Sequence, residues 1–407
     1  MPLIRNKKLI ITCIPLFLVA FIDGAGMGLI FPILNSALIN VHSSILPISD
    51  SITERSILYG ATVGIYMLCY FFGSAIISDL SDIIGRKRAL FICLLGSTIG
   101  FLITGFGIYI QSITIIVIGR IIAGFTAGSQ PVAQASIIDI CPKKQKTYFI
   151  GYVLLSSNLG FILGPILAGI LSDHSLFSWF NLSLPMYFAA CLSLINLIML
   201  ITLYKESFTP IKPIQIKVSR AILIFMSAFN NRSIRHLSLV FFIYILAWSN
   251  YYSFMPMFMT YRYNITSSQV SIMMGLMSIG FVIGIGYLGA KITAHLSRQK
   301  TIIYSLFLGG ILSIVTVLTY SLFLTWILIL PTSITASVAY VTILSLYSDK
   351  VDPDKQGWIM GISSAILGLG YAVTDFTSSI MVSIAYSMPI ILCGLGLLIA
   401  GIYMNKK

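Results

Sequence analysis

The sequence predicts an all-α membrane protein whose twelve transmembrane helices form two pseudo-symmetric six-helix bundles. Three observations predict this fold class: the composition, the number of long apolar segments, and a repeat that relates the two halves of the chain. Of the 407 residues, 57% are hydrophobic and only 9% are charged, and the mean hydropathy is +0.97. A soluble protein could not cover its surface with so few polar groups. The apolar segments are also too long for the strands of an outer-membrane barrel.

The apolar segments are counted by the length that a membrane requires. About twenty consecutive apolar residues cross the hydrocarbon core as a helix. The first segment follows a basic stretch, but it is longer than the core of a signal peptide and contains Asp23, so we expect an uncleaved helix. Twelve segments are long enough, and we expect helices over residues 9–33, 57–78, 90–110, 113–138, 148–171, 182–204, 237–260, 270–292, 302–320, 322–347, 358–384 and 387–404.

Two short segments of the first half recur in the second half at nearly the same spacing. Ser78–Asp82 precedes Gly286–Ala290 by 208 residues, and Pro142–Gln145 precedes Pro353–Gln356 by 211. Both pairs occupy equivalent loops, which indicates that a six-helix unit was duplicated. Two six-helix halves with a binding site between them, near the middle of the membrane, are typical of secondary transporters.

The duplication divides the chain into three parts. We expect an N-terminal bundle over residues 1–207, a cytoplasmic connecting loop over 208–236 and a C-terminal bundle over 237–407. Within the loop, the residues from Ile216 to Phe229 have the pattern of a short helix that lies in the membrane interface.

The positive charges lie almost entirely on one side of the predicted topology. With the amino terminus inside, 22 of the 25 Lys and Arg residues fall in cytoplasmic segments, whereas Arg55 and Arg262 fall outside and Arg120 lies within a helix. Cytoplasmic segments of membrane proteins are enriched in Lys and Arg. We therefore expect a multi-pass protein of the inner (cytoplasmic) membrane with both termini in the cytoplasm. The net charge of +13 is a topology signal, and we expect no nucleic-acid partner.

The sequence has no pattern that indicates a cofactor, a metal or a catalytic centre. The six cysteines are scattered, without the spacing of a metal site or a disulfide framework. A G-x-x-x-x-G-K-[ST] segment is missing, which argues against ATP as the energy source. We therefore expect a protein that is not an enzyme and that requires no cofactor.

Asp23 places one carboxylate inside the first apolar segment. An ionisable group at that depth is costly, and it therefore marks a candidate functional site. From the helical rise, Asp23 lies about 21 Å and Arg120 about 20 Å from the inner membrane face. We expect these two charges to pair. The pair is either static, or it forms a proton site, because burial and a nearby cation have opposite effects on the proton affinity of a carboxylate.

Other polar side chains within the predicted helices are further candidates. Asp375 lies about 25 Å from the inner face. It is either a second proton or cation site or a solvated residue at the outer end of a cavity, and Tyr371 lies one turn below it. Gln134 in the fourth helix and Asn158 in the fifth either line the cavity and bind substrate or bond neighbouring helices.

The seventh helix carries an aromatic stripe that includes Trp248 and Tyr251, with Asn250 beside it. Aromatic side chains in a cavity can bind a planar or cationic substrate by stacking and by cation–π contacts. An aromatic belt at the membrane interface explains some of them equally well. The same stripe also contains Tyr244, Tyr252 and Met255.

Two further motifs stand out. The loop after the second helix contains Asp82, Gly85, Arg86 and Lys87, where the glycine permits a tight turn and the basic residues hold the cytoplasmic side. The fifth helix combines a small-residue groove for close helix contact with a proline that bends the helix. Generic helix packing would also use such small residues, which are Gly151, Gly160, Gly164, Pro165 and Gly169.

With these motifs the whole chain resembles the major facilitator superfamily, and within it the drug–proton antiporters with twelve spans that include the bacterial tetracycline exporters. The loop resembles the family pattern G-x-L-x-D-x-x-G-R-K, with Ser78 where glycine is usual. The fifth helix matches the antiporter pattern G-x8-G-x3-G-P-x2-G-G except at Ala168. The fourth helix matches R-x-x-Q-G-x-G-A-A only in part, since Ala123 and Thr126 replace two of its residues. The first helix matches D-x-x-G-x-G-x-x-x-P at Asp23, Gly26, Gly28 and Pro32.

The resemblance implies the major facilitator fold and proton-coupled antiport, by which a monomer in the lipid bilayer exports an amphiphilic organic compound or drug by alternating access. It implies small organic molecules and protons as partners. In the loop, Asp82 would cap the helix that begins near Gly357 and Trp358 and latch the two halves, or the loop is only a topology anchor. Two other functions remain open: a carrier of a particular metabolite (a siderophore, sugar or amino-acid derivative), possibly inward, and a sensor or assembly partner.

Overall fold

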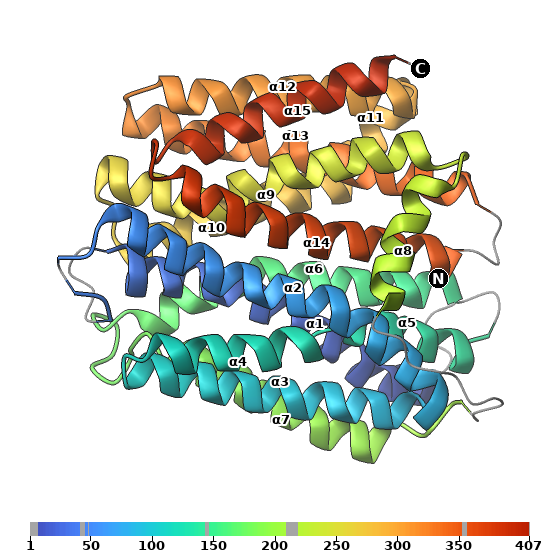
Figure 1. Cartoon of the computed structure of the whole chain (residues 1–407). Helices are drawn as coiled ribbons and strands as arrows, with labels where there is room; N and C mark the ends of the chain where they lie inside the picture. Colours follow the sequence, from blue (N-terminus) through green and yellow to red (C-terminus); the bar gives the residue numbers. More distant parts are fainter. Residues whose placement is uncertain are drawn as a thin grey trace. The chain divides into compact units, whose positions relative to one another are not determined.

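A computed structural model of the protein describes residues 7–40, 45–47, 49–142, 146–208, 219–351 and 356–406. Within these residues every regular element is a helix, so the predicted all-α class is confirmed (Figure 1). The elements of the first half are α1 (Lys7–Leu34), the π-helix η2 (Asn35–Ile39), α2 (Ile52–Ile84), α3 (Arg86–Tyr109), α4 (Ile113–Thr126), α5 (Ser129–Ile140), α6 (Lys146–Ser172) and α7 (Leu184–Leu203). The remaining elements are α8 (Ser219–Asn230), α9 (Arg235–Tyr263), α10 (Ser267–Ile283), the π-helix η3 (Gly284–Leu288), α11 (Gly289–His295), α12 (Arg298–Leu318), α13 (Leu322–Asp349), α14 (Gln356–Met381) and α15 (Met388–Asn405).

Twelve stretches of the described chain are long and apolar enough to cross a membrane, and each coincides with one of the twelve predicted helices. Their ends differ from the prediction by several residues. The second span is the clearest case, because it covers Ile52–Ile84 rather than residues 57–78. Its polar end stays helical because ion pairs satisfy the carboxylates of Asp79 and Asp82.

The fourth span is broken, although the sequence predicted one helix over residues 113–138. α4 ends at Thr126, and α5 begins at Ser129. Pro131 has no backbone N–H, so it cannot bond the carbonyl of Ala127 one turn earlier. A new helix start therefore lies in the middle of a membrane span, where its first N–H groups need partners outside the helix.

The contacts of the chain group it into two compact units. One unit comprises Met1–Ile33 and Ile65–Ala221, and the other comprises Leu34–Gly64 and Ile222–Lys407. The bundle boundaries at residues 207 and 237 stay a prediction, because this grouping follows packing and not chain order.

Hydrogen bonds account for the place of residues 34–64 in the second unit. The Asn35 side-chain amide donates to the Thr260 hydroxyl at 2.9 Å. The Tyr59 hydroxyl donates to the backbone carbonyl of Ser253 at 2.7 Å. The end of the first span and the start of the second are thus bonded to α9.

The same packing pattern occurs in both halves of the chain. α3 packs on α4 and α7, and α12 packs on α13 and α15. An ion pair joins Arg86 at the start of α3 to Asp139 near the end of α5, and another joins Arg298 at the start of α12 to Asp349 at the end of α13. The corresponding residues lie 212 and 210 positions apart, close to the spacing of the loop repeat. The duplicated unit therefore repeats its packing and an ion pair.

The glycines of α6 bring this helix into backbone contact with α1. A Cβ atom added at Gly160 would lie 2.0 Å from the carbonyl oxygen of Phe21, and one added at Gly164 would lie 2.8 Å from that of Ala25. Gly151 differs from both, because nothing lies within 4 Å of the same position. The predicted small-residue groove is thus real, but it begins after Gly151.

This difference gives a matched pair of substitutions. We expect Gly160→Ala to lower the free energy of unfolding by about 1–3 kcal/mol, because the methyl group forces α1 and α6 apart. Gly151→Ala should raise it by up to about 1 kcal/mol, because alanine favours the helix and meets no neighbour. Thermal and denaturant unfolding of the purified protein in detergent measures both effects. Equal effects of the two variants would contradict the contact.

Candidate functional site

Asp23 on α1 lies against the start of α5. Its Oδ2 atom accepts a hydrogen bond from the Ser129 hydroxyl at 2.5 Å, and the backbone amide of Ser129 also bonds this carboxylate. Ser129 is fully buried and is the first residue of α5. The break in the fourth span therefore supplies two donors to the intramembrane carboxylate, at a helix end that favours negative charge.

Arg120 on α4 is 1% exposed, and its guanidinium lies over the ring of Tyr66 on α2, with 3.9 Å from Cζ to the ring centroid. Tyr66 interacts electrostatically with both Arg120 and Asp23. Cys93 on α3 also has Asp23 as an electrostatic neighbour. Four helices thus bring the two predicted charges into one cluster with an aromatic ring.

The contacts of Asp23 and Arg120 in this cluster are with Ser129 and Tyr66, and the direct Asp23–Arg120 pair stays a prediction. Sequence reasoning missed Ser129. A signal was present, because a small residue, serine and a nearby proline are typical of a helix start. The long apolar run concealed it.

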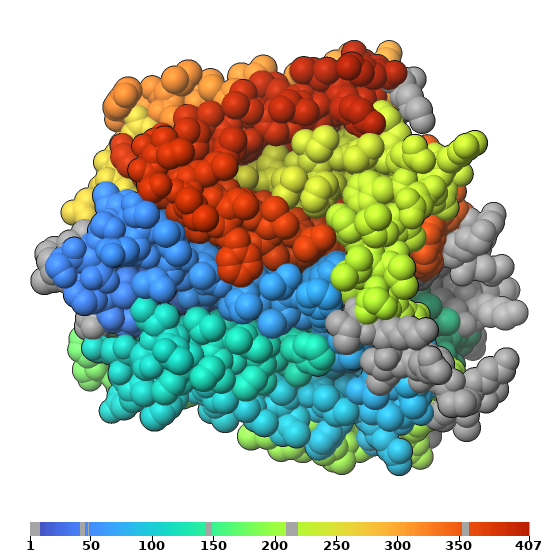
Figure 2. Space-filling view, in the orientation of Figure 1, coloured from blue at the N-terminus to red at the C-terminus, as the bar shows by residue number. Residues whose placement is uncertain are grey.

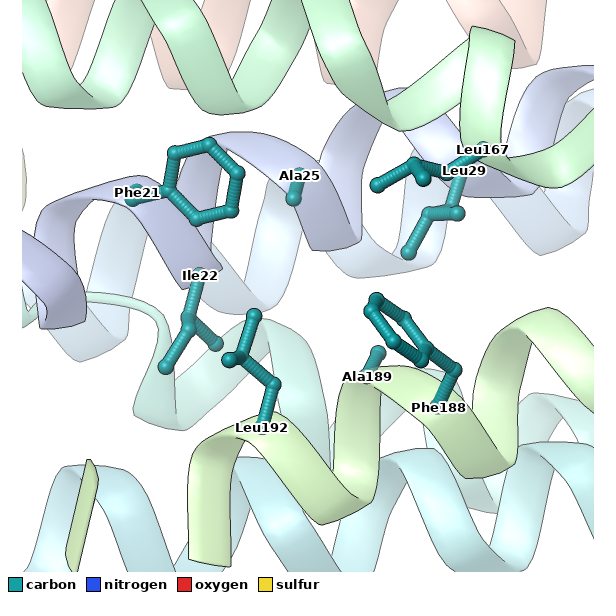
Figure 3. A pocket seen from close by; sticks show the side chains of 8 residues that line it. All are labelled: Phe21, Ile22, Ala25, Leu29, Leu167, Phe188, Ala189 and Leu192. Atoms are coloured by element: carbon teal, nitrogen blue, oxygen red, sulfur yellow. The ribbon is translucent and has the colours of Figure 1, made fainter. Parts of the chain in front are cut away.

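A small apolar pocket lies beside this cluster, between α1, α6 and α7 (Figure 3). Its walls consist only of hydrocarbon side chains, so it suits an apolar group and not a charged one. The predicted polar site residues are not among its lining residues, which are Phe21, Ile22, Ala25, Leu29, Leu167, Phe188, Ala189 and Leu192.

Arg86 is the centre of the predicted loop motif. Its guanidinium forms an ion pair with Asp82 one turn earlier and another with Asp139, where Nε lies 3.3 Å from Oδ2. It also donates to the Ser81 hydroxyl at 2.5 Å and lies over the ring of Phe208. One cation thus fixes the ends of three segments.

Glu206 completes the same loop. Its carboxylate accepts from the backbone amides of Arg86 at 2.9 Å and Lys87 at 3.1 Å, so it caps the start of α3. Gly85 has φ +97°, and a Cβ there would lie 2.4 Å from Glu206 Oε2, so this position requires glycine. The Lys87 ammonium donates to the carbonyl of Ile201. Burial raises the pKa of Tyr204 near this carboxylate.

The predicted latch from Asp82 to the helix beginning near Gly357 and Trp358 stays a prediction, because the side chain of Gly357 lies outside the described residues. Sequence reasoning did not assign a partner to Asp79, which is 1% exposed and forms an ion pair with Arg220 in the first turn of α8.

Asp375 on α14 is completely buried, so the interpretation as a solvated residue is wrong for this conformation. It lies against α2, where a Cβ at Gly64 would be 3.2 Å from the Asp375 Cβ. Tyr59 and Tyr371 are its electrostatic neighbours. The remaining interpretation, an intramembrane proton or cation site, stays a prediction.

The aromatic stripe of α9 is buried within its unit. Trp248 is 2% exposed, stacks on Tyr251 at 5.5 Å and hydrogen-bonds to Tyr371. Asn250 is also buried and donates to the carbonyl of Leu246 at 2.7 Å. An interfacial belt facing lipid does not explain side chains buried in this way.

The two remaining candidates are half-buried. Gln134 lies on α5, and Asn158 lies on α6, where its amide donates to the Leu154 carbonyl of its own helix at 2.8 Å. Neither position decides between a role in the cavity and a role in packing.

The chain is similar along most of its length to known transport proteins. The profile of the Major Facilitator Superfamily matches residues 16–374. The chain is 25% identical to the class C tetracycline resistance protein of Escherichia coli over 90% of this chain and 87% of that protein. It is 24% identical to multidrug resistance protein 2 of Bacillus subtilis over 99% and 97%. A 30% identity to the class H tetracycline resistance protein of Pasteurella multocida covers 50% of this chain and 45% of that protein.

Solved structures share the fold at lower identity. The D-xylose-proton symporter superposes with a TM-score of 0.77 at 14% identity, over 98% of each chain. The human organic anion transporter MFSD10 superposes with a TM-score of 0.71 at 17% identity, over 98% of this chain and 100% of that one. These likenesses establish the architecture.

The two repeated ion pairs predict unequal contributions to stability. Arg86→Gln should lower the free energy of unfolding by about 1–3 kcal/mol, because it leaves Asp82 and Asp139 without their shared cation. Arg298→Gln is the matched control, since the side chains of Arg298 and Asp349 are 41% and 53% exposed. Such an exposed pair contributes about 0–1 kcal/mol. Denaturant unfolding in detergent compares them, and a larger loss for Arg298→Gln would refute the ranking.

Proposed function

The chain belongs to the major facilitator superfamily of membrane transporters, and on this premise we propose that it is a proton-coupled antiporter that exports an amphiphilic organic compound. The proposal includes a monomer in the cytoplasmic membrane, both termini in the cytoplasm, and the loop around Asp82 and Arg86 as a gate on that side. The one-sided distribution of Lys and Arg supports the orientation.

The contact between Asp23 and Ser129 is the observation that carries the proposal. A charged carboxylate accepts hydrogen bonds, whereas a protonated one also donates and no longer favours the positive end of a helix. Protonation of Asp23 therefore weakens its hold on the start of α5. Because Arg120 and Tyr66 belong to the same cluster, their contacts change with the charge of Asp23.

Exchange follows when proton and substrate compete for this cluster. A proton that reaches Asp23 from outside releases the start of α5, and substrate that enters from inside favours loss of the proton inward. No covalent step is needed, since each ligand only shifts the balance between two conformations. Asp375, buried beside Tyr371, is a second position at which a proton or cation would act.

An aromatic, amphiphilic substrate suits the side chains that are available. Trp248 and Tyr251 offer stacked rings, and the pocket beside Asp23 offers an apolar surface. The relatives named for tetracycline and multidrug resistance, similar over most of this chain, support the same substrate class. Tetracycline is therefore the first compound to test.

Transport by the purified protein in vesicles tests the proposal. We expect an imposed pH gradient to drive uptake of tetracycline or another compound of a drug panel, and Asp23→Asn to abolish this coupling by removing the titrating group. Asp173→Asn, which alters a carboxylate at the end of α6, is the control and should transport normally. If Asp23→Asn still couples transport to the gradient, the assignment is wrong. Accumulation of a sugar or siderophore, without drug transport, would instead indicate a metabolite carrier.

Replacing Ser129 tests the role of the helix start. Ser129→Ala should move the pH dependence of exchange toward alkaline pH by about one unit, because the carboxylate loses a donor that favours its charged form. Ser129→Thr keeps the hydroxyl and should restore the original profile. Rates at a series of pH values measure this, and an unchanged profile in Ser129→Ala would exclude a role in coupling.

A further inference from the structure

α8 has two different faces. Phe225 and Phe229 contact the ring of Phe242 on α9, with centroids 5.6 and 6.0 Å apart. The other face presents large apolar side chains at the surface, where Figure 2 shows this helix in yellow-green. Their exposed fractions are large for such residues: 49% for Ile222, 61% for Leu223 and 46% for Met226.

Cations follow directly after this apolar face. Arg232 and Arg235 are both exposed, and the Nε atom of Arg235 donates to the carbonyl of Phe229 at 2.8 Å, which ties it to the end of α8. The sequence contains no Asp or Glu between Glu206 and Asp349, so no acidic residue follows these cations before the end of α13. The end of α8 is therefore strongly positive.

The position of α8 relates it to the bilayer. Arg235 begins α9, which is one of the twelve membrane spans, so α8 ends where a span begins. Figure 1 shows α8 running across the direction of α9. An amphipathic helix with Arg beside its apolar face typically lies in the membrane interface and is attracted to anionic lipids. Guanidinium groups also bind phosphate in a bidentate geometry.

We infer that α8 is a docking surface for anionic phospholipid. Ile222, Leu223 and Met226 enter the boundary between headgroups and acyl chains, while Arg232 and Arg235 bind the phosphate of a headgroup such as that of phosphatidylglycerol. Anionic lipid thereby holds the connecting segment against the membrane, next to the start of α9. This inference does not depend on which substrate the protein carries.

Native mass spectrometry of the full-length protein tests this inference. After exchange into mixed phosphatidylglycerol and phosphatidylcholine, the wild-type protein should retain phosphatidylglycerol preferentially. Arg232→Gln with Arg235→Gln should reduce this retention about 25-fold, since each arginine near an anionic surface contributes about fivefold. Lys300→Gln with Lys406→Gln is the matched control, because it removes two exposed cations elsewhere and should leave retention unchanged.

Two further variants separate the binding of lipid from damage to α8 and from self-association. Arg232→Lys with Arg235→Lys keeps both charges and should retain most of the lipid. Leu223→Glu should reduce retention, because it places a negative charge on the apolar face. The inference fails if the control pair loses as much lipid as the arginine pair, or if inorganic phosphate displaces the lipid completely. It also fails if the apolar face instead holds a second copy, seen as a dimer that Leu223→Glu dissolves.

Discussion

A polar group inside a membrane protein must find its partner within the protein, and this constraint organises the candidate site. The hydrocarbon core supplies no water to satisfy a carboxylate or a free N–H group. Asp23 and the start of α5 are both costly alone, and each satisfies the other. Many Ser and Thr side chains meet the same constraint locally, as when the Thr126 hydroxyl donates to the carbonyl of Ile122. Because Asp23 bonds across helices, a change in its charge affects more than its own helix.

Close packing of backbones makes this arrangement possible. Gly160 and Gly164 allow α6 to approach α1 until backbone atoms are in contact. On α4, a Cβ at Gly124 would lie 2.4 Å from the carbonyl oxygen of Tyr66, so α2 and α4 are equally close. Without a hydrophobic driving force between helices in lipid, such small residues provide the contact area that holds spans together. They position the helices that carry Asp23, Tyr66 and Arg120.

Duplication gave the two halves the same packing, but their ends with repeated ion pairs are not equivalent. Arg86 is largely buried and bonds two carboxylates, whereas Arg298 and its partner Asp349 are exposed. Ala290 stands where the repeat has Asp82. α8 adds a further asymmetry, since Arg220 pairs with buried Asp79 while the apolar face of this helix is exposed. The first half therefore concentrates its ion pairs at one end, which is consistent with a gate on one side only.

The sequence by itself determined the helices, because bilayer thickness dictates the length of each apolar run and charge placement follows topology. It also identified the groove at Gly160 and Gly164, the turn at Gly85 and the helix α8, since each depends on residues close together in the chain. Only the tertiary structure decided the contacts of Asp23 and Arg120, the burial of Asp375 and the membership of residues 34–64. The reason is physical: Asp23 and Ser129 are 106 residues apart, and the pairing of two such residues depends on how helices rotate and break when they pack.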